Sequence, residues 1–315
     1  MLGYLARKAA GASTIGLLAL ASAACAGDTP ALESAAATGA TDTVSEATGQ
    51  NGPALWVVAD EDTRIYLFGT IHALPESIEW MDEDISTALK ASDTLVTEVD
   101  MASMAGPEMV RIIQTTAVLP QGTTLRSLLS PEQLETYEAA MERIGYPISG
   151  LDRFEPWYAG IMLAMVPLQQ RGYSSESGVE KVLLQYAGEI DKAALETPDF
   201  QLGVFDQLPP ESQIQFLIEA AENVEDITPY LDAMVAVWLE GDAEALAGKM
   251  NEGLTDAALA EALLFKRNET WAEWIDTRLD SPGTVFMAVG AGHLAGKRSV
   301  QDYLEERGFK VTRIQ

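Results

Sequence analysis

The sequence predicts an α/β fold with a central mixed, mostly parallel sheet, formed by the two ends of one domain, and a large inserted helical layer. Apolar, strand-like runs gather in residues 54–100 and 283–314, whereas residues 130–279 show mainly helical periodicity. Each end also contains a strand, a helix and a second strand in succession, which is the order that connects parallel strands. We therefore expect both ends to contribute strands to one sheet.

The N-terminal part starts with two strands over 54–60 and 64–71, and the polar residues 61–63 join them as a β-hairpin. A helix over 82–92 and a strand over 93–100 follow. This strand, helix, strand order predicts that 93–100 runs parallel to 64–71 and lies beside it.

The middle of the chain is expected to be helical. The helix over 130–145 has Ser130 as N-cap, Pro131 at its first position and Gln133 placed for a capping box. One buried strand, 189–196, interrupts the helical part. The same periodicity predicts further helices over 155–172, 209–224, 228–242 and 255–279, with Trp157, Trp271 and Trp274 in the core.

The C-terminal part repeats the order of the N-terminal part. An apolar strand at 283–293 precedes a helix over 294–308, and a final strand covers 309–314. We expect these strands to complete the sheet that the N-terminal part begins.

The charge of the chain limits its partners. With 20 Lys and Arg against 48 Asp and Glu, the net charge is −28. Such a chain repels phosphate backbones and anionic lipid headgroups, so nucleic acid is excluded as a partner and a basic membrane-binding patch is not expected. A peptide or small-molecule substrate remains, and the oligomeric state stays open.

The first 25 residues are typical of an export signal. Arg7 and Lys8 precede the uncharged stretch 9–24, which is too short and too rich in alanine for a membrane-spanning helix. Cys25, the single cysteine, follows directly, so two outcomes stay open: acylation of Cys25 in a lipoprotein, or ordinary cleavage near residues 21–23. Ser22 stands where a lipoprotein signal usually has leucine. Either outcome places the protein in a bacterial envelope, as a periplasmic protein or as a lipoprotein whose lipid is its membrane anchor.

Residues 26–52 are small, polar and acidic, and we expect them to be a disordered linker. The folded domain then covers 53–315. With its only cysteine in the signal region, this domain has neither an intramolecular disulfide nor a cysteine-rich zinc site.

Both histidines of the chain end the same local pattern. His72 lies three residues after Gly69, His293 lies three residues after Gly290, and each pair follows an apolar strand. Residues just beyond the carboxyl ends of parallel strands line the crevice where α/β sheets bind ligands. Glu98 ends another of these strands. Two imidazoles and a carboxylate are the ligand types of a divalent transition metal, although a histidine bonded to a backbone carbonyl is the structural alternative.

Several motifs together resemble the TraB/GumN family, which includes the Tiki metalloproteases. The similarity covers about 55–314 and rests on "YLFGTIHALP", "LVTEVD", "LLSPEQL", "LDRFEPWYAG", "RGYSSESGVE", "FKRNETWAEWI" and "TVFMAVGAGHLAGKRSVQDYLEERGFKVTRI". The resemblance implies an α/β fold related to erythromycin-esterase and ChaN-like proteins, with an active centre of two G-x-x-H motifs and an acidic residue. It also implies a divalent metal cofactor, manganese or cobalt, and proteolytic activity.

Matched by position, the resemblance implies further site residues. These are Arg153 before "PW", Glu180 where the family often has Asp, Glu196 in "LET", and Arg267 with Asn268 in "KRN" where the family resembles "ERN". Glu196 or Glu98 would act as general base, and Arg153 or Arg267 would stabilise an oxyanion or bind a substrate carboxylate. For Arg267, a solvated helix face is an equally good interpretation, because the surrounding stretch is charged.

Three functions remain open from the sequence. The first is an exported, metal-dependent hydrolase, a peptidase, with His72, His293 and Glu98 as metal ligands. In the second, a histidine and Glu98 hydrolyse an ester without metal. The third is a peptide-binding or sugar-binding protein without catalysis. No Walker loop, H-E-x-x-H or G-x-S-x-G motif occurs in the sequence.

Overall fold

The computed structural model describes residues 52–104, 106–251 and 257–315. The expected signal segment, Cys25 and the linker up to residue 51 lie outside these described residues, so the structure does not bear on them. Within the described part of the chain, no helix is both long enough and apolar enough to cross a membrane.

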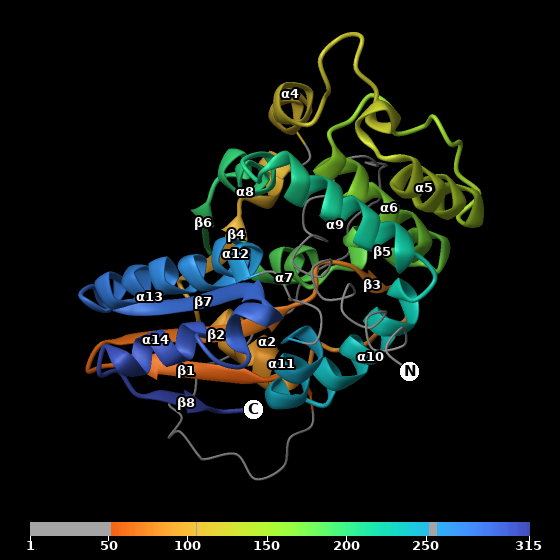
Figure 1. The fold of residues 1–315 in the computed structure, drawn as a ribbon. Coiled ribbons are helices and arrows are strands. Elements are labelled where there is room, and N and C mark those ends of the chain that lie inside the picture. The colour runs from red at the N-terminus through yellow and green to blue at the C-terminus, as the bar shows by residue number, and fades with distance from the viewer. Residues whose placement is uncertain (1–51, 105, 252–256) are drawn as a thin grey trace.

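A six-stranded sheet forms the centre of the domain, in the order β6-β4-β7-β2-β1-β8 (Figure 1). Its strands are β1 (Leu55–Ala59), β2 (Thr63–Thr70), β4 (Thr94–Val99), β6 (Asp191–Glu196), β7 (Gly283–Gly290) and β8 (Val311–Arg313). The four neighbours β6, β4, β7 and β2 are parallel, whereas β1 is antiparallel to both β2 and β8. This sheet confirms the predicted mixed, mostly parallel α/β fold.

Alternation along the strands gives the sheet two apolar faces, as expected where helices cover both sides. On β2, for example, Ile65 and Leu67 point to one core, and Tyr66 and Phe68 point to the other. One face packs against α13 (Lys266–Leu279) and α14 (Val300–Glu306), which lie together over the sheet in Figure 1. Helices α2 (Glu83–Lys90), α7 (Val179–Ala187), α10 (Ile227–Leu239) and α11 (Ala243–Asn251) contribute to the core of the other face.

The inserted helical layer has a small core of its own. Helices α5 (Pro131–Arg143), α6 (Pro156–Gln170) and α9 (Pro210–Glu222) pack together around buried Tyr137 and Leu163, away from the sheet (Figure 1). Ser130 caps α5 and forms the predicted capping box with Gln133. The connecting elements are α3 (Met101–Met104), α4 (Pro107–Thr116), α8 (Pro198–Asp206), α12 (Ala257–Ala260), a π-helical turn at Glu261–Phe265, and the short pair β3 (Leu74–Pro75) and β5 (Tyr173–Ser174). Within the part of the chain that the structure describes, 3₁₀ turns lie at Leu125–Leu128, Ser175–Ser177 and Ala291–Leu294.

Three details of the predicted fold are wrong. β4 does not lie beside β2, because β7 inserts between them and pairs with both. The strand at 189–196 is not buried, since β6 is the edge strand and only its last two residues are half-buried. The helix expected over 294–308 begins only at Val300, where Ser299 provides the N-cap.

Candidate functional site

The parallel strands bring the predicted site residues together at one edge of the sheet. Glu98 lies near the end of β4, Glu196 ends β6, and Gly290 ends β7. His72 follows β2 by two residues, and His293 lies in the turn after β7. Because all four strands are parallel, their carboxyl ends point the same way and the side chains meet.

His72 is held by a carboxylate that the sequence marked only by resemblance. Nδ1 of His72 forms an ion pair with Oε1 of Glu180, and Thr70 donates to the same oxygen at 2.5 Å. The N–H of Val179 donates to the carbonyl of Ile71, which fixes the start of α7 against His72. At Gly178 a Cβ would lie 2.1 Å from the carbonyl oxygen of His72, so only glycine allows this approach. Burial opposes the charge on His72, but Glu180 and Glu98 outweigh it and raise the pKa to about 9.

Glu98 is a buried carboxylate with three donors. Oε1 accepts from the N–H of Gly290 at 2.7 Å, and Oε2 accepts from Nη2 of Arg267 at 2.6 Å and from Nε2 of Gln201 at 2.9 Å. Although burial disfavours the ionised form, the charge of Arg267, together with the nearby imidazoles and the N–H of Gly290, holds the pKa of Glu98 well below its usual range. Glu98 is therefore ionised and a weak proton acceptor.

Arg267 lies at the centre of the cluster, not on a solvated helix face. Its side chain is 8% exposed, and its guanidinium lies 4.8 Å from the centre of the Trp271 ring. All five N–H groups are used: they reach both oxygens of Glu196, Oε2 of Glu98, the carbonyl of Leu263 and Nε2 of His293. With no donor left over, Arg267 is not free to bind an oxyanion, and this corrects the role that the sequence suggested for it.

The turn before Arg267 is π-helical, over Glu261–Phe265. Its Leu263 carbonyl accepts from Nη1 of Arg267 at 2.9 Å. Such turns widen a helix locally and are frequent at functional sites. Here the turn sets the position from which α13 directs Arg267 and Asn268 toward the strand ends.

His293 is buried and neutral. Its Nδ1 lies 2.6 Å from Oδ1 of Asn268, and Nδ2 of Asn268 donates to the carbonyl of Arg298 at 2.7 Å. This places the proton of the neutral ring on Nδ1, so Nε2 accepts from Arg267 at 3.2 Å. Burial, and then the charge of Arg267, lower the pKa of His293 to about 3. The ring centre of His293 lies 4.3 Å from that of Trp271.

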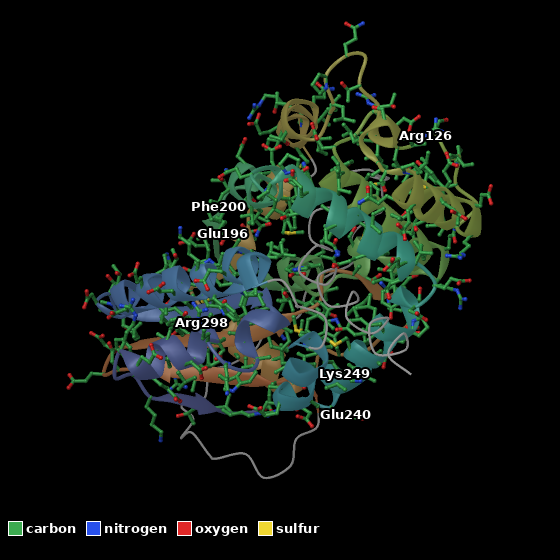
Figure 2. All side chains as sticks on the ribbon, in the orientation of Figure 1. Arg126, Glu196, Phe200, Glu240, Lys249 and Arg298 are labelled. Carbon is green, nitrogen blue, oxygen red and sulfur yellow. The ribbon has the colours of Figure 1, made fainter. Side chains whose placement is uncertain are left out.

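Glu196 supports Arg267 from the end of β6. Its two oxygens accept from Arg267 at 2.8 Å each, and they also accept from Gln201 at 3.0 Å and from the indole N–H of Trp271 at 3.0 Å. Figure 2 shows Glu196 beside the exposed Phe200, where β6 gives way to α8. With these donors in place, we interpret Glu196 as a residue that positions Arg267, not as a general base.

Three side chains of the site converge on Gly290. A Cβ on Gly290 would lie 3.0 Å from Oε1 of Glu98, 3.4 Å from Nε2 of His72 and 3.5 Å from Cδ2 of His293. The other G-x-x-H glycine, Gly69, is structural: its carbonyl accepts from the Trp238 indole at 2.8 Å. A Cβ on Gly69 would also lie 3.0 Å from the Cα of Ala291.

The donor set fits a divalent transition metal. Each histidine has its Nδ1 bonded to an oxygen, of Glu180 or of Asn268, and such bonds orient metal-ligating imidazoles. Among the described residues, however, no three His, Asp or Glu side chains lie close enough together to hold an ion. An ion on Nε2 of His293 would also have to replace the hydrogen bond from Arg267.

A pocket lies beside His72, with about 330 Å³ of empty space that includes open solvent. His72, Glu98 and Glu180 form its polar side, and the remaining lining residues are Thr97, Val99, Met101, Ser175 and Lys181. Oε1 of Glu180 accepts from Thr70 and faces His72, whereas its Oε2 has no hydrogen bond within the described residues. The pocket therefore gives a small ligand access to one edge of the buried cluster.

Arg153 lies apart from the site. It is exposed, its guanidinium lies over the ring of Phe154, and its carbonyl accepts from Leu119 in the helical layer. The structure instead adds Gln201, Thr70, Trp271 and Lys181 to the site or its pocket. Trp271 is core, as expected, but no sequence signal distinguished Gln201, because α8 reaches the strand ends only in the folded chain.

Comparison with known proteins gives one family and a few distant relatives. The model of the TraB/PrgY/gumN family matches residues 54–313. The uncharacterized protein YbaP of Escherichia coli (strain K12) is 25% identical over 259 residues, which cover 80% of this chain and 92% of YbaP. An uncharacterized protein of Treponema pallidum (strain Nichols) is 24% identical over 269 residues, or 80% of each chain. No solved structure gave a match.

Proposed function

The chain belongs to the TraB/PrgY/gumN family, and from this premise we propose that it is an exported, metal-dependent hydrolase that cleaves peptides. His72, Glu98 and His293 would hold the metal, with manganese or cobalt as the candidate ions. Export, and either a lipid anchor on Cys25 or a free periplasmic state, belong to the same proposal, because they rest on the sequence of the first 25 residues.

The proposal rests on the convergence of His72, Glu98 and His293 at Gly290. Nε2 of His72 and Oε1 of Glu98 both approach the place where a Cβ of residue 290 would be, and the ring of His293 lies beside them. These groups come from three separate strand ends. Glu98 and His293 have partners in the protein, whereas Nε2 of His72 has no hydrogen bond within the described residues and is open to a ligand. A metal ion with open coordination positions is the ligand that two imidazoles and one carboxylate suit best.

The protein residues have separate tasks in this mechanism. A bound ion would activate water and polarise the scissile carbonyl. Glu180 and Asn268 orient the two imidazoles through their Nδ1 atoms. Arg267 keeps Glu98 ionised, so that this carboxylate remains a ligand.

Hydrolysis joins the oxygen of water to the carbonyl carbon, breaks the C–N bond and transfers a proton from the water to the leaving nitrogen. Glu98 is bound to Arg267, and both oxygens of Glu196 accept from the same guanidinium, so both carboxylates already hold a cation. Glu180 lines the pocket, and its Oε2 has no hydrogen bond within the described residues. We therefore assign the proton transfer to Glu180.

One observation favours a second function, hydrolysis of an ester without metal. His72 and Glu180 form a buried imidazole–carboxylate pair that opens on the pocket, an arrangement that also serves as general base and orienting group. In that case Nε2 of His72 would take the proton of water only at alkaline pH, because its pKa of about 9 keeps the ring protonated below that, and His293 would keep its bond from Arg267.

The metal content of the purified full chain distinguishes the two functions. After loading with manganese or cobalt and desalting, the wild-type chain is expected to retain about one ion per chain, and the His72→Ala/His293→Ala double variant none. Circular dichroism controls for folding, and Arg153→Ala, which lies outside the site, should behave as wild type. Peptide cleavage that a chelator stops would support the peptidase. Ester cleavage that survives a chelator would support the metal-free alternative, and the absence of both activities would favour a binding protein.

A further inference from the structure

We propose that the pocket beside His72 binds a free carboxylate of the substrate and that Lys181 is the residue that selects it. This inference rests on the proposed hydrolase and names its substrate class: peptides whose C-terminal carboxylate lies close to the cleaved bond. The sequence did not predict Lys181 as a site residue, and only the structure places it in the lining of the pocket.

Lys181 differs from the other charged residues that line this pocket. Glu98 is paired with buried Arg267, and Glu180 with buried His72. Lys181 is paired with Glu176, and these side chains are 23% and 59% exposed. An ion pair at the surface contributes little to stability, so a substrate carboxylate can replace Glu176 at low cost.

The start of α7 adds to the positive potential at the pocket. Its N-cap is Gly178, which provides no side-chain cap, and Lys181 occupies the first turn, where a negative charge is usual. The acidic residue of that turn, Glu180, faces Thr70 and His72 instead. Ser175 lines the same pocket, and its hydroxyl group can donate a hydrogen bond to a bound carboxylate.

His72 lines the same pocket. Its side chain is 9% exposed, and its Nε2 has no hydrogen bond within the described residues. In the proposed hydrolase the reacting bond lies at this buried atom, and the substrate carboxylate would then contact Lys181 in the pocket wall. The empty space of about 330 Å³ in this pocket includes open solvent, so the pocket takes the terminal carboxylate while the rest of the substrate stays outside. Val99 and Met101 in the pocket wall favour an apolar side chain next to this carboxylate.

Binding of two matched probes tests this inference without requiring turnover. N-acetyl-methionine and N-acetyl-methionine amide differ only in the carboxylate, and calorimetry measures their affinity for the metal-loaded full chain and for the chain without added metal. We expect the acid to bind at least tenfold more tightly than the amide in the wild type. Lys181→Gln should remove this difference and Lys181→Arg should keep most of it.

Glu176→Gln is the matched control, because it removes the surface partner of Lys181 and should leave the preference for the acid intact or increase it. Equal binding of acid and amide, no binding of either, or a preference that survives Lys181→Gln would overturn the inference. A carboxylate preference that depends on Lys181, without cleavage of any peptide or ester, would uphold the inference while the hydrolase fails. Equal cleavage of free and amidated peptides would uphold the hydrolase while this inference fails.

Discussion

Nη1 of Arg267 lies 3.2 Å from Nε2 of His293 and donates to it. The ring nitrogen with which His293 would bind a metal is therefore already occupied by a hydrogen bond. The same guanidinium binds Glu98 and Glu196 and uses all of its donors in doing so. Arg267 thus links the ends of β4, β6 and β7, and any ligand that reaches His293 must compete with it.

Removal of Arg267 should destabilise the domain strongly. Arg267→Met leaves Glu98 and Glu196 buried without their cation, and breaking a buried ion pair in this way costs about 3–5 kcal/mol. Urea unfolding measures the loss. Arg153→Met is the control, because this arginine is exposed and its replacement should change the free energy of unfolding by less than about 0.5 kcal/mol. Similar effects of both substitutions would contradict the central position of Arg267.

Gly290→Ala should remove metal binding while the fold remains. The backbone at Gly290 allows alanine, with φ −49°, but its Cβ would lie 3.0 Å from Oε1 of Glu98 and 3.4 Å from Nε2 of His72. We expect at least a tenfold loss of manganese or cobalt affinity, measured by titration. Gly248→Ala, where a Cβ would meet nothing within 4 Å, is the matched control and should bind as wild type. Unchanged affinity of Gly290→Ala would argue against a metal at this point.

Alkaline pH should weaken the fold through His72. Its pKa rises from 6.5 to about 9 on folding, so the stabilisation is complete below pH 6.5 and is lost as the pH rises through about 9. Each proton released on unfolding in this window changes the free energy of unfolding by about 1.4 kcal/mol per pH unit. Urea midpoints across this range should fall in the metal-free wild type, and less in Glu180→Gln, which lacks the main cause of the raised pKa. A slope that Glu180→Gln leaves unaltered would contradict this assignment.

Mildly acidic pH should weaken the fold through His293. The pKa of this ring falls from 6.5 to about 3 on folding, so below pH 6.5 the unfolded chain binds a proton that the folded chain does not. Stability should therefore decrease from pH 6.5 to about pH 5, before the carboxylates titrate, by at most about 2 kcal/mol. His293→Gln should remove this pH dependence of the free energy of unfolding. If the stability of the wild type stays constant between pH 6.5 and about 5, the folded chain binds a proton on His293 as readily as the unfolded chain does.

The sequence predicted the positions of some site residues correctly and of others not, and each outcome has a physical reason. The two G-x-x-H motifs and Glu98 could be placed at one sheet edge, because strand ends can be read from apolar runs followed by glycine. Arg267 could not be placed, since its charged neighbours suggest a solvated helix. Its burial depends on a π-helical turn and on two carboxylates from distant strands. Arg153, matched only by resemblance, remains exposed in the helical layer.

Sequence alone determined the six strands of the central sheet, the longest helices and the two histidine-bearing strand ends, because these follow from local periodicity and turn chemistry. It missed α3, α4, α7, α8 and α11. Tertiary structure decided the strand order, with β7 between β2 and β4, since pairing between distant segments depends on how whole faces pack. It also decided the protonation of the site. Two histidines with the same local motif have pKa values of about 9 and about 3, because one meets Glu180 and the other meets Arg267.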